Sequence, residues 1–450
     1  MRKLFIANRG EIAVRIIRTA REMGIGTVVG ISEADRGSLA ASAADGFAVL
    51  GPAPAPASYL NQEAVIAAAL EHGCDAVHPG YGFLSENATF ARKVAEAGLI
   101  WVGPAAEAID MMGNKSLARE SARRAGVPVL KGTDGPLAPE ADALALAREI
   151  GYPLVVKASA GGGGRGIRFV HEESELLSTI EMARGEAGAV FGDSTVYLER
   201  FVDHARHVEV QILGDGVNFI HLGDRDCSMQ RRSQKVIEEA PAPDLPDAVR
   251  REIRESSVEL ARQCGYRGAG TVEFLYDPDR HEAAFIEMNT RIQVEHPITE
   301  QITGVDLVRE QLLIAYEGAM SVSQEDVAFT GHAIECRINA EDPDNNFFPS
   351  PGRLTRLVWP EGEGVRIDSG VDEGSVVTPY YDSMLAKLIV HAPDRAAAIE
   401  GTLRALEAIE VEGVKTTIPM HRMLLSRPEF ADVAHHSKFI ETVPDLLEAP

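Results

Sequence analysis

The sequence contains little cysteine, and this limits the kinds of site and compartment to consider. Its 450 residues include only Cys74, Cys227, Cys264 and Cys336, each far from the others along the chain. Metal-binding and redox motifs need closely spaced cysteines, so neither is indicated. Structural disulfides persist mainly in oxidising compartments. We therefore expect reduced, mostly buried thiols in a cytoplasmic protein.

Basic charge and long apolar runs are also scarce. The chain has 44 Lys and Arg against 68 Asp and Glu, which gives a net charge of −24. Nucleic acids are bound through basic surfaces, so we expect no nucleic-acid partner. No apolar run approaches the roughly 20 residues that cross a bilayer, and the first run is too short for a signal peptide. We therefore expect no membrane partner, whereas a nucleotide held by local basic residues is compatible with this composition.

The beginning of the chain lacks the glycine fingerprint of dinucleotide-binding proteins. Residues 1–103 alternate short apolar strands with amphipathic helices, which predicts a parallel sheet with helices on both faces. The first strand–helix turn, ANRGEI (7–12), does not match G-x-G-x-x-G, so a nicotinamide cofactor is not favoured. A glycine-rich loop at 78–87 follows a strand at 76–78. Such a loop is typical of ligand binding in open sheets, but a tight turn explains it equally well.

The stretch 271–297 carries the strongest chemical signal. It predicts two strands around a turn at 277–280, and a turn centred on Arg280 places Glu273 directly opposite Glu287. Opposed carboxylates repel each other, and the simplest cation between them is Mg²⁺. Alternation continues this face through a series of polar residues and places Ile286, Met288 and Ile292 on the other side. The alternative is a solvated polar strand face. The predicted polar series is Asn289, Arg291, Gln293 and Glu295.

Two further segments favour a phosphate or another anion. A glycine loop at 160–166 joins predicted strands at 153–159 and 167–170, and Lys157 directly precedes it. Bare backbone N–H groups close over phosphates, although a surface hairpin is the alternative. After an alternating strand at 207–213 comes a predicted basic loop at 225–239. Its cations favour an anion site or a charged helix surface about equally.

The segment 331–442 predicts a third unit. Residues 332–341 alternate as a strand, with Arg337 on the same face as Ala333, Glu335 and Asn339. A helix is predicted over 395–407, with Asp394 as its N-cap.

The order of these motifs resembles the biotin carboxylase family, within the ATP-grasp superfamily, over nearly the whole chain. The motifs are long and specific. They are ANRGEIA (7–13), HPGYGFLSEN (78–87), KASAGGGGRG (157–166), DCSMQRRSQKVIEEAPAP (226–243), EMNTRIQVEHP (287–297) and ECRINAED (335–342).

The resemblance implies a mixed α/β and α+β fold class. It implies an ATP-grasp fold with an N-terminal Rossmann-like parallel sheet domain, a mobile lid and a C-terminal mixed α+β domain. The expected boundaries are 1–112 for the first domain, 113–330 for the ATP-grasp domain with a glycine-flap lid at about 130–203, and 331–450 for the last.

The resemblance also implies a role for each matching residue. Glu295 is expected to be the base that deprotonates bicarbonate, and Arg337 is expected to stabilise the enolate-like oxygen of biotin. The metal, Mg²⁺ or Mn²⁺, is expected on Glu273, Glu287 and Asn289. Bicarbonate is expected on Lys235, Arg291, Gln293, Val294 and Glu295. The nucleotide is expected on Lys115, Lys157, Gly163, Gly164, Glu199, Arg200, Phe201, Val202, His207, Gln234, Glu273 and Glu287.

Two departures from the family pattern concern the nucleotide. Ser233 stands where many members have an imidazole, which puts ATP affinity in question, and Ala160 stands where glycine is common, which stiffens the flap.

The implied reaction is ATP- and bicarbonate-dependent carboxylation of biotin through carboxyphosphate. The sequence has no Ala-Met-Lys-Met biotinyl motif and no room for a carboxyltransferase. The expected partners are therefore a biotin carboxyl carrier protein and a carboxyltransferase, as in the acetyl-CoA carboxylase of fatty acid synthesis, and a homodimer follows from the resemblance. Alternatives are the same subunit of a pyruvate, 2-oxo-acid or other acyl-CoA carboxylase, an ATP-grasp ligase that joins a carboxylate to an amine, and an inactive nucleotide-binding regulator.

Overall fold

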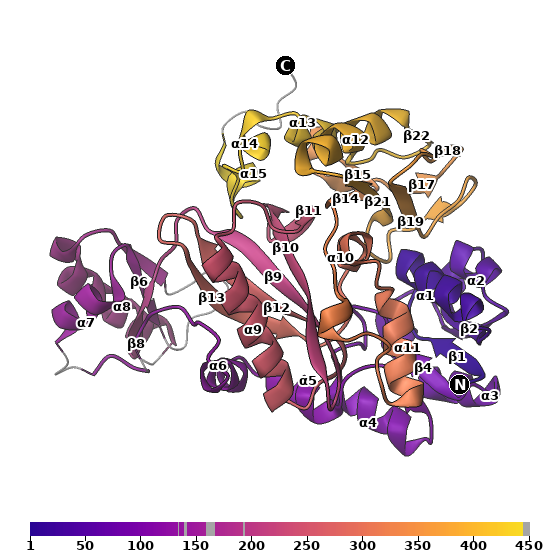
Figure 1. Ribbon diagram of the computed structural model, residues 1–450, viewed down its shortest axis with the longest axis horizontal. Helices are drawn as coiled ribbons and strands as arrows, with labels where there is room; N and C mark the ends of the chain where they lie inside the picture. The colour runs from indigo at the N-terminus through magenta and orange to yellow at the C-terminus, as the bar shows by residue number, and fades with distance from the viewer. Residues whose placement is uncertain (134, 139–141, 159–166, 192–193, 444–450) are drawn as a thin grey trace.

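The computed structural model describes residues 1–133, 135–138, 142–158, 167–191 and 194–443 (Figure 1). The predicted flap residues Gly163 and Gly164, and the departure at Ala160, lie outside these residues.

The N-terminal part is a parallel sheet between two layers of helices, as the alternating pattern predicts. Its strand order is β3-β2-β1-β4-β5. Side chains of alternate positions, such as Leu4 and Phe5, enter two separate cores on opposite faces of the sheet. The strands are β1 (Lys3–Ile6), β2 (Gly26–Ser32), β3 (Gly46–Gly51), β4 (Ala76–His78) and β5 (Ile100–Trp101). The helices are α1 (Gly10–Glu22), α2 (Leu39–Ala43), α3 (Gln62–Glu71), α4 (Ala88–Glu96), α5 (Ala106–Gly113) and α6 (Lys115–Arg124).

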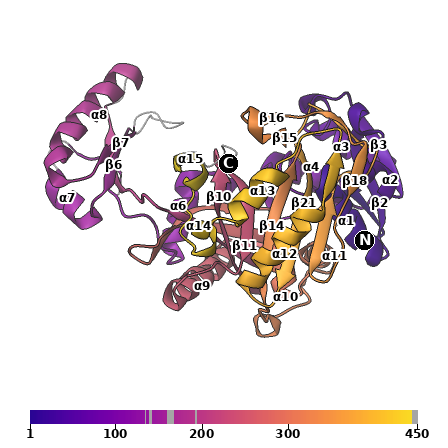
Figure 2. The same cartoon turned by 90° about the horizontal axis from the view of Figure 1, so that it is seen from above.

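A small antiparallel unit stands apart from the rest of the chain (Figure 2). Its sheet has the order β7-β6-β8, and its own apolar core includes Leu154, Leu176 and Leu198. This unit, which we call the lid unit, consists of α7 (Ala143–Ile150), β6 (Leu154–Ala158), β7 (Ile167–Val170), α8 (Leu176–Phe191) and β8 (Val196–Arg200).

The centre of the molecule is an eight-stranded sheet, which includes both predicted hairpin strands. Its order is β13-β12-β9-β10-β11-β14-β21-β19. Helix α9 (Asp247–Gln263) covers one face, where Val208, Val210 and Ile212 are buried against it. The strands are β9 (Arg206–Asp215), β10 (Phe219–Arg231), β11 (Gln234–Ala240), β12 (Arg267–Asp277), β13 (Glu282–Asn289), β14 (His332–Asn339), β19 (Val365–Ser369) and β21 (Met384–Ala392). Helices α10 (His296–Thr303) and α11 (Leu307–Glu317) follow the hairpin.

Short elements complete the C-terminal part. Helix α12 (Arg395–Ala408) begins after Asp394, whose side chain accepts from the N–H of Ala397 as the sequence predicts. It packs on β14 and β21. The remaining elements are β15 (Glu341–Asp342), β16 (Phe348–Pro349), β17 (Gly352–Arg353), β18 (Arg356–Val358), β20 (Val376–Val377), β22 (Glu410–Glu412), α13 (Ile418–Leu425), α14 (Pro428–Ala431) and α15 (Phe439–Thr442).

The prediction of a loop at residues 225–239 is wrong, because these residues are mostly strand. These residues form the hairpin of β10 and β11, in which Gln230 pairs with Lys235. Arg232 and Ser233 form the turn with positive φ angles of 49° and 62°. The strands were hard to recognise because buried charged residues, which partner one another, interrupt their apolar pattern.

The β12–β13 hairpin and the pairing of Glu273 with Glu287 are confirmed, but the predicted centre at Arg280 is wrong next to the turn, where Asp277 pairs with Glu282, and the predicted extent is also wrong. Glu273 pairs directly with Glu287, and a register shift next to this pair makes Phe274 pair with Phe285. Ile286 is therefore the extra residue of a bulge and is 42% exposed, which contradicts its predicted place on the other face. The strand ends at Asn289, so alternation does not carry Arg291, Gln293 and Glu295. These three residues are instead positioned by the loop 290–295, which leads into α10.

The domain boundaries stay a prediction. Strands β11 and β14 pair across the expected boundary at 330/331, so one sheet joins the two parts.

Candidate active site

One row of charged side chains crosses four neighbouring strands of the central sheet. Glu287 on β13 pairs with Glu273 on β12, and Glu273 pairs with Glu209 on β9. Glu209 in turn pairs with Arg225 on β10. Directly opposed residues share one face of a sheet. The register alone therefore brings three carboxylates and one guanidinium together.

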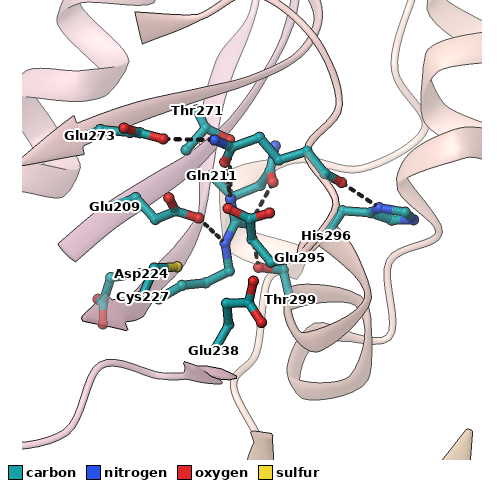
Figure 3. A network of polar contacts seen from close by, with 12 residues as sticks. Glu209, Gln211, Asp224, Cys227, Glu238, Thr271, Glu273, Glu295, His296 and Thr299 are labelled. Carbon is teal, nitrogen blue, oxygen red and sulfur yellow. Dashed lines mark hydrogen bonds and ion pairs between the residues drawn. The ribbon is translucent and has the colours of Figure 1, made fainter. Parts of the chain in front are cut away.

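Arg225 binds several of the side chains beneath the site, and Figure 3 labels four of them, Glu209, Gln211, Thr271 and Thr299. It is fully buried, and its Nε lies 2.6 Å from Oε1 of Glu209. Its Nη2 donates to Oε1 of Gln293 at 2.9 Å. The guanidinium also donates to Gln211, Thr271 and Thr299. A planar guanidinium with fixed donors thus sets the orientation of Glu209 and Gln293.

Lys235 on β11 lies among three carboxylates. Its Nζ is 2.6 Å from Oε2 of Glu209, 3.0 Å from Oε1 of Glu273 and 2.6 Å from Oε1 of Glu295. Burial alone disfavours an ammonium ion, but these carboxylates raise the pKa of Lys235 well above its usual value. Lys235 is therefore a fixed positive charge.

Glu295 connects Lys235 to Arg337 of β14. Its Oε1 faces Lys235, and its Oε2 is 3.0 Å from Nη2 of Arg337. Burial raises the pKa of Glu295, but Lys235 and Arg337 outweigh burial and lower it below the usual value. Arg337 also donates from Nε to Oε1 of Glu238 at 2.6 Å. Glu295 is thus an ionised carboxylate with a cation on each oxygen.

The loop 290–295 is tied to the N-terminal part. Nε of Arg291 is 2.8 Å from Oε2 of Glu86, a residue of the glycine-rich loop 78–87. Asn8 donates from Nδ2 to the carbonyls of Pro79 and Tyr81, at 2.7 Å each, and so fixes that loop. The loop is therefore both a tight turn and part of the site, because Tyr81 lines the cavity described below.

His207 has a strongly shifted pKa. Burial and the ammonium of Lys235 disfavour its charged form, but the carboxylates of Glu273 and Glu209 outweigh them and raise its pKa to about 9. Its Nε2 lies 3.3 Å from Oε2 of Glu273. His207 is therefore an imidazolium at neutral pH and adds positive charge to the cavity.

The predicted metal residues fit a hard cation. Burial and the opposed carboxylate of Glu273 raise the pKa of Glu287, as expected when two carboxylates face each other. Asn289 donates from Nδ2 to Glu273 at 2.9 Å, and its Oδ1 accepts from Arg291 at 2.9 Å. Carboxylate and amide oxygens are the ligands that Mg²⁺ takes.

Two other groups of ligand atoms lie close enough together for a metal among the described residues. They are His207, Glu209 and Glu273, and Glu209, Cys227 and Glu295. Both groups include Glu209, whose two oxygens already contact Arg225 and Lys235. Lys235 and His207 also contact Glu273, so the carboxylate that favours the pair of Glu273 and Glu287 as a metal site is that of Glu287.

A cavity of about 730 Å³ joins these residues. It brings together most of the residues predicted for metal, bicarbonate and biotin. The departure Ser233 lies on its wall, as do Tyr81 and Ile286. The predicted site residues that line it are His207, Gln234, Lys235, Glu273, Glu287, Asn289, Arg291, Gln293, Val294, Glu295 and Arg337.

The other predicted nucleotide residues that the structure describes lie outside this lining. Lys157 and Glu199 form an ion pair between β6 and β8 of the lid unit. Arg200 donates to the carbonyl of Ile150 and pairs with Glu282 at 2.6 Å, so its side chain joins the lid unit to the hairpin. Phe201 packs against Phe169, Val202 is buried, and Lys115 is exposed at the start of α6.

The sequence analysis missed several residues of this network. Glu209 was seen only as part of an alternating strand, and Arg225 only as one cation of the predicted loop. Glu238 was not singled out. The signal for Glu209 was available, because a strand face that reads His207, Glu209, Gln211 opposite an apolar face needs buried partners. Arg225 and Glu238 required knowledge of which strands are neighbours.

Two further expectations can be compared with the structure. Cys74, Cys227 and Cys336 are buried, Cys264 is partly exposed, and all four are free thiols. Across the described ranges, none of the helices has the length and apolar character needed to pass through a bilayer.

Comparison with known families covers nearly the whole chain. Three family descriptions match: "Biotin carboxylase, N-terminal domain" at residues 1–109, "Carbamoyl-phosphate synthase L chain, ATP binding domain" at 114–322, and "Biotin carboxylase C-terminal domain" at 335–442. Biotin carboxylase 1 of Bacillus subtilis is 49% identical over 443 residues, which is 98% of each chain.

Solved structures agree with this result. The biotin carboxylase subunit of a pyruvate carboxylase superposes with a TM-score of 0.94 at 47% identity, over 100% of this chain and 99% of the other. The biotin carboxylase domain dimer of the Hydrogenobacter thermophilus 2-oxoglutarate carboxylase, in complex with MgADP, ADP and bicarbonate, gives a TM-score of 0.85 at 45% identity, over 100% and 99%. These structures confirm the predicted fold class, the ATP-grasp fold with an N-terminal parallel sheet.

Proposed function

The chain belongs to the biotin carboxylase family, and we propose that it uses ATP and bicarbonate to carboxylate biotin carried on a separate protein. It is an ATP-dependent enzyme of the ligase class. The observation that carries the assignment of roles is the position of Glu295, whose two carboxylate oxygens contact Lys235 and Arg337 in one cavity.

Glu295 is proposed as the base. Bicarbonate is a poor nucleophile until it loses its second proton, and a positioned carboxylate removes that proton. Because Lys235 and Arg337 lower the pKa of Glu295, it is a weak base while both contacts persist. An anion that binds to Lys235, Arg291 and Gln293 would weaken the contact between Lys235 and Glu295 and so raise the basicity of Glu295. Bicarbonate therefore activates its own base when it binds, with Val294 as a further contact.

The proposed steps balance as follows. Glu295 takes the proton of bicarbonate, and a carbonate oxygen attacks the γ-phosphorus of ATP, which releases ADP and forms carboxyphosphate. Carboxyphosphate breaks into CO₂ and phosphate, which accepts the proton from N1′ of biotin, and that nitrogen attacks CO₂. Glu295 then releases its proton to solvent, which restores the base. Arg337 places positive charge where the biotin oxygen becomes anionic.

Glu273, Glu287 and Asn289 are proposed to hold Mg²⁺ or Mn²⁺, consistent with their oxygens and with the raised pKa of Glu287. The ion would neutralise charge on the ATP phosphates. Lys115, Lys157, His207, Gln234, Gly163 and Gly164 are proposed to contact the nucleotide, and the backbone from Glu199 through Arg200 and Phe201 to Val202 is proposed to meet adenine. Ser233 offers one hydrogen bond and no charge at its place in the cavity.

The proposed partners are a biotin carboxyl carrier protein and a carboxyltransferase, with acetyl-CoA as the final acceptor in fatty acid synthesis and a homodimer as the assembly. A pyruvate, 2-oxo-acid or other acyl-CoA carboxylase is the second candidate. The similarity to the biotin carboxylase subunit of a pyruvate carboxylase supports this second candidate, because both kinds of enzyme use the same biotin carboxylation half-reaction. We propose the cytoplasm as the location, and domains at 1–112, 113–330 and 331–450 with a lid at about 130–203.

The proposed function is tested by ADP release in CO₂-depleted buffer. We expect little release without bicarbonate, restoration when bicarbonate is added, and a further increase with free biotin. Equal rates with and without bicarbonate would contradict the assignment, and release that depends on an added amine would support an amine ligase instead.

A further inference from the structure

A second pair of opposed glutamates lies behind the active site. Glu238 on β11 pairs directly with Glu335 on β14, so both side chains lie on the same face of the sheet. Both residues have 0% exposure. Arg337 is two residues beyond Glu335 on the same strand and therefore shares this face.

The pair has fewer hydrogen-bond partners than two buried carboxylates require. Oε1 of Glu238 accepts from Nε of Arg337 at 2.6 Å. Oε2 of Glu238 and both oxygens of Glu335 have no hydrogen-bond partner among the described residues. Buried polar atoms are nearly always paired, so these atoms require an explanation.

The surrounding charges do not supply it. Lys387 of β21 lies opposite Arg337, but its Nζ contacts Oε1 of Glu11 at 3.1 Å and the carbonyl of Val294 at 2.7 Å. Helix α10 contributes His296, whose pKa burial lowers well below its usual value, so it brings no positive charge. Arg337 is shared with ionised Glu295. One guanidinium therefore faces three carboxyl groups.

A single proton resolves the arrangement. A protonated carboxyl group is a hydrogen-bond donor, whereas an ionised one only accepts. With its proton, Glu335 can donate to the unpaired Oε2 of Glu238. Burial raises the pKa of Glu238 as well, to about 7, but Glu238 is the member that contacts Arg337, which opposes this rise and favours its ionised form. When two carboxylates share a buried site, one of them has a strongly raised pKa. Burial raises the pKa of Glu335, Lys387 and Arg337 oppose this effect, and repulsion from Glu238 and Glu295 adds to it, so that the pKa lies well above its usual value.

We propose that Glu335 is a neutral carboxylic acid in the folded protein and that it positions Arg337 by holding Glu238. The second half of this proposal rests on the proposed role of Arg337 at biotin. Ionisation of Glu335 would add a negative charge beneath Arg337 and reduce the positive field that reaches the cavity. The neutral acid therefore serves as a positioning residue for the carboxyl-transfer step and has no part in bicarbonate activation.

Two substitutions at Glu335 test whether this residue acts as a neutral hydrogen-bond donor or only fills space. Glu335→Gln keeps a neutral donor of nearly the same shape, so we expect carboxybiotin formation close to that of the parent. Glu335→Leu keeps bulk but leaves Glu238 unpaired, so we expect a loss of about tenfold, the lower range for groups that orient a functional side chain. Bicarbonate-dependent ADP release should be nearly unchanged in both variants. Equal losses in the two variants, or equal losses in the two assays, would overturn the positioning role.

Infrared difference spectra of the full chain at neutral pH test the protonation state directly. Parent minus Glu335→Gln should show the band of a protonated carboxyl group, and a carboxylate band instead would overturn the proposal. The infrared measurement depends neither on enzyme activity nor on the Leu variant. It therefore remains valid if Glu335→Leu does not fold. It also remains valid if bicarbonate-dependent ADP release is absent, a result that would count only against the proposed function.

Glu239→Gln is the matched control. Glu239 is the next residue on β11, lies on the opposite face and is buried with Arg395 and His332 as partners, which together lower its pKa. Its difference spectrum should show a carboxylate band. A protonated band at Glu239 as well would mean that the method does not distinguish the two sites and would remove the support for a neutral Glu335.

Discussion

The two opposed glutamate pairs of the central sheet have the same geometry and different surroundings. Glu273 and Glu287 lie at the open edge of the cavity, where Glu287 is exposed. Glu238 and Glu335 lie in the interior, where neither side chain reaches solvent. In both pairs the carboxyl groups face each other across one strand pairing. The cost of two adjacent negative charges is therefore common to both pairs.

The difference lies in what can neutralise that charge. An open edge admits a hydrated cation together with nucleotide phosphates, so repulsion between Glu273 and Glu287 becomes affinity for a metal ion. A closed interior admits no such ion, and a proton is the remaining neutralising species. The sheet thus uses one local arrangement for two purposes, and solvent access decides between them.

The largest effect is expected at Glu295, which connects the two pairs through Lys235 on one side and Arg337 on the other. Glu295→Gln removes the base and should lower bicarbonate-dependent ADP release by about 10²–10⁴, the usual worth of general base catalysis. MgATP affinity, measured by calorimetry, should remain near that of the parent.

Glu300→Gln is the control for this change. Glu300 is a buried carboxylate of α10 that pairs with Arg15 and Arg366 away from the cavity. It should lose stability and keep its turnover per folded molecule. A loss of MgATP affinity in Glu295→Gln would instead assign Glu295 to the open-edge pair.

The next effect concerns the cation that the buried pair supports. Arg337→Ala should cut carboxybiotin formation by roughly 10²–10³, the loss expected for one preorganised donor, and leave most bicarbonate-dependent ADP release. Arg395→Ala is the counterpart across the same strand, because Arg395 contacts Glu239 through Nε at 2.7 Å on the opposite face. If both variants behaved alike, Arg337 would be structural.

A smaller effect is expected at the open edge. Glu287→Gln removes one negative charge from the proposed metal site, so the Mg²⁺ concentration for half-maximal ADP release should rise at least about tenfold. Asp279→Asn removes the same charge from the turn of the hairpin and should leave the requirement unchanged. A normal Mg²⁺ requirement in Glu287→Gln would show that repulsion within this pair does not serve a metal.

The two pairs also show how far sequence reasoning reaches. Glu273 and Glu287 belong to one hairpin, so turn chemistry was enough to bring them close together. Counting from Arg280 gave the right partner because the bulge at Ile286 adds one residue to a ladder in which Asp277 pairs with Glu282. Glu238 and Glu335 are 97 residues apart and meet only because β14 joins the sheet beside β11. No local pattern contains that information. For the same reason the positions of Arg225 and Glu209 under the site, and of Glu86 beside Arg291, could not be derived.

Local irregularities set a second limit. The bulge at Ile286 and the end of β13 at Asn289 arise where the chain turns into α10. Alternation cannot anticipate such points, because it assumes a regular strand. Alternation predicted that Arg291, Gln293 and Glu295 lie together, but it assumed a continuous strand that the structure does not have. The family resemblance predicted the same grouping without that assumption.

The smallest effect is a slope in stability with pH, and it distinguishes the buried pair from the open one. The pKa of Glu335 is raised in the folded protein above its ordinary value of 4.5. At pH values between 4.5 and the raised pKa, Glu335 keeps a proton in the folded chain that it has released in the unfolded chain. The stability of the parent therefore falls as pH rises through this range. The slope for one proton is about 1.4 kcal/mol per pH unit.

Glu335→Gln cannot ionise at this position, so its stability lacks this dependence on pH. Its advantage over the parent in urea unfolding should therefore grow with pH at about that rate, starting above pH 4.5. Glu239→Gln should show the opposite sign in a different range, because the pKa of Glu239 is lowered in the folded protein: the parent gains stability relative to this variant as pH rises toward 4.5, and above 4.5 their difference is constant. A Glu335→Gln variant whose unfolding free energy runs parallel to that of the parent across this range would mean that Glu335 is ionised when buried, and both pairs would then consist of two carboxylates.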